Sequence, residues 1–187
     1  MVTAMRPGTI LNKFMARDGR EVILRAPKWG DLGDMLDFIN SLVDEAAMIA
    51  ANQKQTRESE IDWLARKLTS LEKDRIIHVV AEVEGRMVGS CEVEPRPGRF
   101  SHVGVLGVSV KDGYREVGIG QRLMKEAERQ APQMGLESIM LEVFATNDRA
   151  IHVYEKMGYR RIGAIPGGVK YRGEYVDAVS MYKRIAG

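Results

Sequence analysis

The chain has 187 residues, of which 44% are hydrophobic and 29% are charged, so it is long enough for one domain with a sizeable core and has no bias towards disorder. Its 28 Lys and Arg residues and 26 Asp and Glu residues leave a formal net charge of +2 at pH 7. This balance excludes the strongly basic surface of a dedicated nucleic-acid-binding protein. We expect a single domain over residues 1–187 and no nucleic-acid partner.

The single cysteine, Cys91, cannot form a disulfide within the chain or supply a cysteine-based zinc cluster, so we expect no metal cofactor. Charged residues without a long apolar segment in the first twenty positions argue against a signal peptide. No run approaches the roughly 18 apolar residues that a membrane span needs. The sequence therefore predicts a cytoplasmic protein with no membrane contact.

The first predicted strand is EVILR, residues 21–25, and residues 1–20 are interpreted as an extended N-terminal arm ahead of it. Apolar residues then recur at helical spacing over residues 32–43 and again over residues 61–71. Two helices are therefore expected between the first strand and the next.

The sequences IIHVVAEV (76–83) and MVGSCEVE (87–94) flank the turn EGR and predict an antiparallel hairpin. A third strand is expected at residues 101–110. Apolar residues at positions 119, 123, 127 and 131 then give one face of a helix, and SIMLEVF (138–144) reads as the next strand.

A short helix around residues 150–157 is expected to end at Gly158. Two further strands, residues 159–165 and 175–185, flank the turn-rich segment PGGVKYRGE. Because strands outnumber helices and helices occur both before and after the strands, the pattern predicts an α/β (α+β) domain. Its central mixed sheet would be mostly antiparallel, with six to seven strands flanked by about four helices.

The segment VSVKDGYREVGIGQRL (108–123) places two glycines between a strand and an amphipathic helix. Such a turn lets backbone N–H groups converge on an anion beside the positive end of the helix dipole. A dinucleotide fingerprint would need a glycine where Leu123 stands, and a P-loop would need a lysine in place of Ile119. The two common phosphate-binding motifs are therefore excluded.

The remaining pattern, Arg115-x-x-Gly118-x-Gly120 between a strand and a helix, resembles the coenzyme A pyrophosphate loop of the GCN5-related N-acetyltransferase (GNAT) family. A second block, LEVFATNDRAIHVYEKMGYRR (141–161), is similar to the family's later motif, a strand followed by Asn and then Ala-Ile-x-x-Tyr-Glu-x-x-Gly-Tyr. The two blocks occur in the family's order and together cover residues 103–159.

The resemblance implies an N-acetyltransferase that moves an acetyl group directly from acetyl-CoA, its co-substrate, to a primary amine. The acceptor would be a protein N-terminus, an amino acid or a polyamine-like small amine, because the C-terminal hairpin is too weakly patterned to choose between peptide and small-molecule acceptors. A non-catalytic acyl-CoA-binding regulatory module is the alternative function, and a homodimer is among the expected assemblies.

The resemblance also implies which residues contact coenzyme A. The strand residues would pair with the pantetheine arm, whose amides can mimic a strand, and one of their N–H groups could stabilise the oxyanion. For Asn147, a helix N-cap is the competing interpretation. The predicted cofactor-binding residues are Val108, Ser109, Val110, Arg115, Glu116, Val117, Gly118, Ile119, Gly120, Gln121, Asn147 and Tyr154.

Acetyl transfer to an amine needs a proton acceptor, because an alkylamine with a pKa near ~10.4 is mostly protonated at neutral pH. Glu142 is the predicted acceptor, since it is a carboxylate within an apolar strand and its place resembles that of the proton acceptor in the ribosomal-protein alanine acetyltransferase branch. A solvated strand face is the competing interpretation, and Glu92, Glu94 and His102 are alternative bases.

The leaving thiolate needs a proton donor, and Tyr154 is the predicted acid. Its phenol has an unperturbed pKa of about 10 and is mostly protonated at pH 7. By resemblance, it occupies the family's tyrosine position beside the coenzyme A sulfur. The competing interpretation is an aromatic residue that only packs on the sheet.

Overall fold

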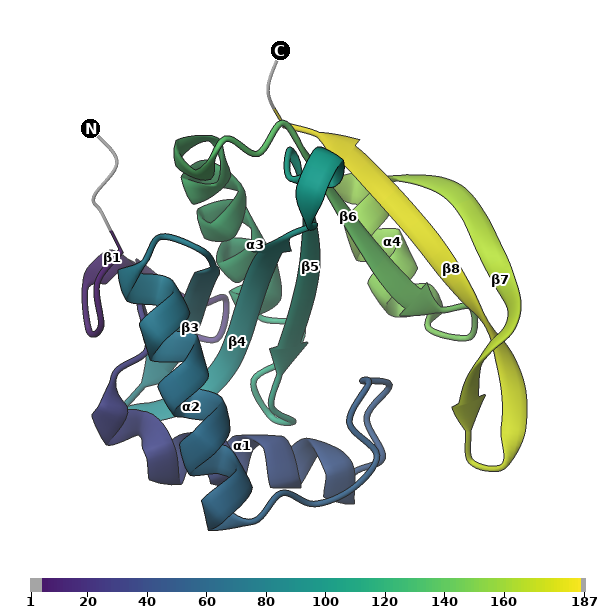
Figure 1. Ribbon diagram of the computed structural model, residues 1–187. Helices are drawn as coiled ribbons and strands as arrows, with labels where there is room; N and C mark the ends of the chain where they lie inside the picture. Colours follow the sequence, from purple (N-terminus) through teal and green to yellow (C-terminus); the bar gives the residue numbers. More distant parts are fainter. Residues whose placement is uncertain (1–4, 186–187) are drawn as a thin grey trace.

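The computed structural model describes residues 5–185 (Figure 1). Within them, the strands are β1 (Ile10–Met15), β2 (Glu21–Arg25), β3 (Ile77–Val83), β4 (Arg86–Pro95), β5 (Val103–Val110), β6 (Ser138–Phe144), β7 (Arg160–Tyr171) and β8 (Glu174–Arg184). The α-helices are α1 (Leu32–Asp44), α2 (Arg57–Glu72), α3 (Ile119–Gln130) and α4 (Asp148–Lys156). None of the helices in this part of the chain is long and apolar enough to cross a lipid bilayer.

The strands form one sheet in the order β1-β2-β3-β4-β5-β6-β8-β7. All neighbours run antiparallel except β5 and β6, which confirms the prediction of a mixed, mostly antiparallel sheet. The eighth strand is β1, which pairs with β2 from Ile10 opposite Arg25 to Met15 opposite Glu21. The interpretation of residues 1–20 as an extended arm therefore needs correction for residues 10–15, while residues 1–4 lie outside the described part.

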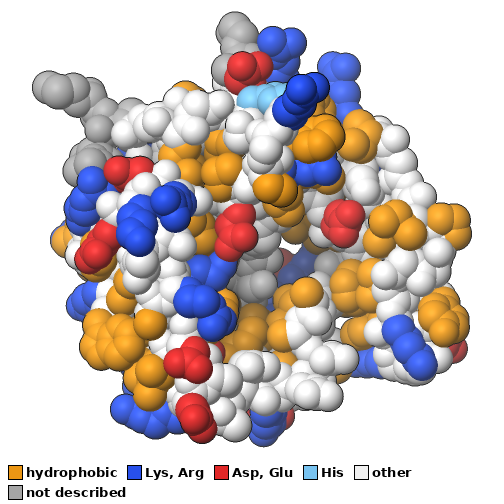
Figure 2. Space-filling view, in the orientation of Figure 1, with side chains coloured by type: hydrophobic (Ala, Val, Ile, Leu, Met, Phe, Trp, Pro, Cys, Tyr) orange, Lys and Arg blue, Asp and Glu red, His pale blue; other side chains and the backbone are white. Residues whose placement is uncertain are grey.

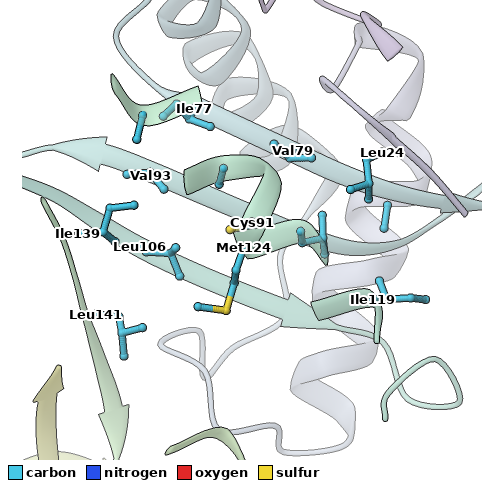
Figure 3. Close-up of a cluster of buried hydrophobic side chains, with 14 of the residues drawn as sticks. Leu24, Ile77, Val79, Cys91, Val93, Leu106, Ile119, Met124, Ile139 and Leu141 are labelled. Carbon is cyan, nitrogen blue, oxygen red and sulfur yellow. The ribbon is translucent and has the colours of Figure 1, made fainter. Parts of the chain in front are cut away.

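Helices cover both faces of the sheet: α1 and α2 lie on one face, and α3 and α4 lie on the other (Figure 1). The predicted apolar face of α3 is correct, because Ile119, Leu123, Ala127 and Ala131 are each at most 1% exposed. They pack with strand residues such as Cys91 into the main core, part of which is drawn in Figure 3. The core fixes α3, and with it the glycine turn that precedes this helix, against the middle of the sheet.

The parallel pairing of β5 with β6 is short. It includes only the pairs from Val103 with Ser138 to Val105 with Met140, and the two strands then diverge (Figure 1). The rest of β5, up to Val110, is hydrogen-bonded to β4 on one side only. Figure 2 shows that the molecular surface is hollowed over this divergence. The fold thus leaves backbone N–H and C=O groups of β5 open at the centre of the sheet.

The C-terminal hairpin differs from the sequence prediction. The turn is formed by Arg172 and Gly173, whose φ values of +51° and +86° match the two left-handed residues of a type I′ hairpin turn. Strand β7 continues through the expected turn segment, and the residues Pro166–Gly168 form an irregularity where the register with β8 shifts. Proline and glycine thus mark a β-bulge here, and the strand beyond it extends the hairpin.

Candidate active site

The glycine turn between β5 and α3 presents free backbone donors. Gly118 is the N-cap of α3 and has a φ of +96°, and Glu116 is also left-handed, with a φ of +65°. Within the described residues, the backbone N–H groups of residues 115–118 donate no hydrogen bond. Together with the first N–H groups of α3, they make a turn that can bind an anion through its backbone.

The charged side chains of this turn already have partners. The Arg115 guanidinium donates through Nε to the carbonyl oxygen of Val110 at 2.7 Å and forms an ion pair with Glu45 at the end of α1. The Glu116 carboxylate lies 2.7 Å from the Arg149 guanidinium on α4. Arg115 therefore ties the turn to the end of β5, and the backbone N–H groups are the donors that stay free for an anion.

The predicted residues Val108, Ser109 and Val110 form the end of β5 and are half-buried. Their pairing with β4 places Val108 opposite Cys91, and their other edge faces the divergence. An extended amide-bearing ligand could add to this edge as a strand would. The structure thus brings these residues next to the glycine turn, at one end of the same strand.

Tyr154 is half-buried on α4 and packs against the main core, with its ring edge-on to Tyr159 at a centroid distance of 6.2 Å. Burial, and to a lesser extent the neighbouring Cys91, raise the pKa of Tyr154 to about 12. Since Cys91 lies opposite Val108, the tyrosine sits on the α3–α4 face close to the end of β5. At neutral pH it is an uncharged proton donor.

Glu142 lies on β6, opposite Ser180 of β8. Its neighbours Leu141 and Val143 are buried on the α3–α4 side, so alternation along the strand directs Glu142 to the α1–α2 face. Its side chain is exposed and has no hydrogen-bond or ion-pair partner among residues 5–185. The two predicted catalytic side chains therefore lie on opposite faces of the sheet at the divergence of β5 and β6.

The alternative bases lie in different environments. The Lys67 ammonium on α2 is 2.5 Å from the Glu92 carboxylate and also forms an ion pair with Glu94. His102 is exposed before the start of β5, at the opposite end of this strand from Val108–Val110. The structure thus places Glu92 and Glu94 on the α1–α2 face with Lys67 and leaves His102 away from the divergence.

Asn147 has the structural role that competes with cofactor binding. Its Oδ1 accepts a hydrogen bond from the Ala150 N–H at 3.2 Å, which caps the N-terminus of α4. A contact between Asn147 and coenzyme A stays a prediction. In the described residues, no group of three or more His, Cys, Asp or Glu side chains could hold a metal ion.

A second set of contacts encloses the α1–α2 face of the site, and it includes Tyr171, which the sequence suggested as a residue that lines the acceptor groove or packs. The Tyr171 hydroxyl on β7 donates to the Ala46 carbonyl oxygen at 2.6 Å, and its ring is edge-on to Phe144 at 5.5 Å. The Thr146 hydroxyl lies 3.9 Å from the Met48 sulfur. The segment after α1 is thus tied to β7 and to the end of β6, and aromatic residues at the ends of strands were the sequence signal for it.

A sheet divided beside a glycine turn agrees with the acetyltransferase resemblance of the two sequence blocks. The family model described as Acetyltransferase (GNAT) family matches residues 37–159. The chain therefore belongs to the GNAT family and is an N-acetyltransferase, as the two sequence blocks predicted.

Individual relatives agree with this assignment. The chain is 25% identical to the Bacillus subtilis protein named Putative phosphinothricin acetyltransferase YwnH. The aligned 156 residues cover 82% of this chain and 93% of the relative. The chain is 37% identical to the Escherichia coli L-amino acid N-acetyltransferase AaaT. The aligned 112 residues cover 57% of this chain and 67% of the relative. The crystal structure of a ribosomal-protein-alanine N-acetyltransferase from Brucella melitensis is similar with a TM-score of 0.77, at 26% identity over 86% of this chain and 98% of that one.

Proposed function

We propose that the chain transfers the acetyl group of acetyl-CoA directly to a primary amine, with Glu142 as the proton acceptor and Tyr154 as the proton donor. The backbone of residues 115–121 would bind the pyrophosphate, and the open edge of β5 would pair with the pantetheine arm. Cytoplasmic location and a homodimer stay predictions from the sequence.

The observation that carries this proposal is the placement of the two side chains on opposite faces of the divergence. A thioester bound along the open edge of β5 would have Glu142 towards its α1–α2 side and Tyr154 towards its α3–α4 side. An amine entering from the first side would be deprotonated there, and the sulfur would leave towards the second. A thioester bound in this way would therefore have the base on the side of the attacking amine and the acid on the side of the leaving sulfur.

The proposed reaction balances without a further reactant. An ammonium acceptor first loses one proton through Glu142 to solvent. The neutral amine nitrogen then forms a bond to the thioester carbonyl carbon, and the second proton that the nitrogen loses passes to the Glu142 carboxylate. A β5 N–H stabilises the oxyanion, the carbon–sulfur bond breaks, and the thiolate takes the Tyr154 proton. Proton exchange with solvent returns Glu142 to the carboxylate and Tyr154 to the phenol. Cys91 is fully buried and burial raises the pKa of its thiol, so this thiol does not serve as an intermediate acyl carrier.

The names of the relatives favour a small-molecule amine. One is an L-amino acid N-acetyltransferase and another is named as a phosphinothricin acetyltransferase, and both compound classes present an amine on a small carbon skeleton. We therefore rank free amino acids first among acceptors, with peptide N-termini and polyamines after them.

The test is an acceptor screen with acetyl-CoA and thiol release as the readout. Five amines cover the classes: L-leucine, L-methionine, L-leucinamide, an alanyl peptide and spermidine. Thiol release that depends on the amine supports the proposal. Calorimetric binding of acetyl-CoA without turnover on any amine would instead indicate the acyl-CoA-binding regulatory module.

A further inference from the structure

A row of three residues crosses the α1–α2 face of the sheet towards the divergence. His78 on β3 lies opposite Glu92 on β4, and Glu92 lies opposite Gly107 on β5. Because directly opposite residues share a face and strands are about 4.8 Å apart, the row runs about 10 Å from His78 to Gly107. It starts at the fully buried His78 side chain and ends at the exposed backbone of Gly107.

The buried end of the row is polar. His78 Nε2 lies 3.0 Å from the Ser90 hydroxyl and 3.5 Å from the Glu92 carboxylate, while His78 Nδ1 is buried without a hydrogen-bond partner in the described residues. On α2, the Trp63 ring is edge-on to His78, and Lys67 reaches Glu92. An unpaired buried polar atom lowers stability, so simple packing does not explain this arrangement.

The open end of the row is a glycine that packing does not require. A Cβ atom at Gly107 would meet nothing within 4 Å, and its φ is not left-handed. Gly104, three residues earlier, is different, because a Cβ there would lie 2.5 Å from Val93. Gly107 thus leaves free space on the face of the sheet where the Glu92 carboxylate lies.

Two carboxylates beside this space share one ammonium, because Lys67 forms ion pairs with both Glu92 and Glu94. Burial, and to a lesser extent Glu92, raise the pKa of the nearby Glu60 carboxyl on α2. Burial lowers the pKa of His78, so its ring is neutral at pH 7 and adds no positive charge. A cation that enters beside Gly107 would therefore be attracted to Glu92.

We infer that Glu92 is a second carboxylate of the acceptor site, which binds the ammonium group of the amine in the space above Gly107 before Glu142 removes its proton. Lys67 and His78 hold the Glu92 carboxylate in place from its other sides. The inference rests on the proposed function, and it divides the acceptor side between a binding carboxylate on β4 and a base on β6.

The test measures kcat and both KM values in the acetyl-CoA assay, with whichever of the five amines the wild-type chain acetylates fastest. Because a charge-assisted hydrogen bond is lost, Glu92→Gln is expected to raise the amine KM at least about tenfold. The acetyl-CoA KM should change less than about twofold, since Glu92 lies away from the glycine turn.

Glu72→Gln is the control, because it removes an exposed carboxylate at the end of α2 that has no part in the row. Its amine KM should stay within about twofold of the wild-type value. Gly107→Val tests the site without changing the buried cluster. It fills the space beside Glu92 in a strand that tolerates a β-branched residue, and it should also raise the amine KM.

The outcomes separate the inference from the function it rests on. An unchanged amine KM in Glu92→Gln, an equal rise in Glu72→Gln, or an unchanged amine KM in folded Gly107→Val overturns the role of Glu92 alone. A wild-type chain that acetylates none of the five amines overturns the proposed function as well.

Discussion

At the divergence of β5 and β6, the two faces of the sheet have different chemistry. On the α3–α4 face, the side chains close to the end of β5 are uncharged: Cys91, Leu123 and Tyr154 belong to or pack against the main core. On the α1–α2 face, the side chains at the same level include Glu142 and Glu92, which are carboxylates open to solvent in part. Close to the end of β5, the first face thus carries uncharged side chains, whereas the second carries carboxylates.

This difference matches the two halves of acetyl transfer. A proton donor that must stay protonated gains from burial, which disfavours its anion, and Tyr154 has this environment. A base and a cation-binding group need charge, which the α1–α2 face supplies. Substitutions on each face should therefore impair different steps of the reaction.

Removal of the base from the charged face should have the largest effect. Glu142→Gln keeps the size of the side chain and removes its basicity, so kcat should fall about 100-fold at neutral pH. The rate should recover in part as the pH rises and more of the amine is neutral, which a pH–rate profile measures. Glu137→Gln, an exposed residue just before β6, is the control and should leave the profile unchanged.

An unaltered profile in Glu142→Gln would contradict the assignment. The proton acceptor would then be Glu92, Glu94 or an ordered water.

Removal of the donor from the neutral face should have the next largest effect. Tyr154→Phe keeps the packing surface, and kcat should fall at least about tenfold, equivalent to ~1.4 kcal/mol, with acetyl-CoA affinity little changed. Because the pKa of Tyr154 is about 12, ionisation of this residue should not reduce the rate of the wild-type chain between pH 7 and about 10.

Tyr159→Phe is the control for this face. The Tyr159 hydroxyl is 2.9 Å from Glu128, so its loss should lower thermal stability and leave turnover nearly unchanged. If Tyr154→Phe shows that pattern instead, Tyr154 is a packing residue.

The glycine turn lies between the faces, and its substitution should weaken cofactor binding in addition to stability. Gly118→Ala and Gly113→Ala both place an L side chain at a positive φ, of +96° and +77°, with no contact within 4 Å. Each should lose about 1 kcal/mol of stability from backbone strain. Only Gly118→Ala should also weaken acetyl-CoA binding several-fold in calorimetry, because the strain displaces the N–H groups of the turn. Equal acetyl-CoA affinities would contradict a pyrophosphate site there.

The smallest expected effect is on the pH dependence of stability. Burial lowers the pKa of His78, an effect that the charges of Lys67 reinforce and those of Glu92, Asp31 and Glu94 oppose. The unfolded chain therefore binds this proton more readily, and His78 reduces stability as the pH falls below ~6.5, by at most about 1.4 kcal/mol per pH unit. Urea unfolding at pH 7 and pH 5 measures this slope.

His78→Leu should flatten the slope between these two pH values, and the exposed His102→Leu should not. Equal slopes in the wild-type chain and in His78→Leu would show that protonation of His78 does not contribute to the pH dependence of stability.

The parts of the fold that the sequence predicted have strong local patterns. Strand β2 begins and ends where predicted, and the apolar spacing of α3 identified four buried residues. Strand β1 was missed because Ile10–Met15 has no buried residue, so its alternation carries no core signal. Its pairing with β2 stabilises it, and that contact is not visible in the strand's own residues.

In the candidate site, too, the sequence predicted the parts that are contiguous in the chain and missed the contacts between distant residues. The glycine turn and the helix that carries Tyr154 are contiguous motifs, so short segments of sequence were enough to identify them. The ion pairs of Lys67 with Glu92 and of Arg115 with Glu45 join residues 25 and 70 positions apart. Spacing in the sequence does not predict such pairs, because the sheet order and the packing of α1 and α2 bring them together.

The position of β8 in the sheet also affects the order in which the chain can fold. Strand β8 follows β7 in sequence but lies between β6 and β7, and it is the strand that pairs with Glu142 and its neighbours. During synthesis on the ribosome, β6 and β7 are therefore complete before the strand that joins them to each other has emerged. The wall of the site that carries Glu142 is among the last parts of this enzyme to gain its native partners, and activity should appear only after that late, non-local step.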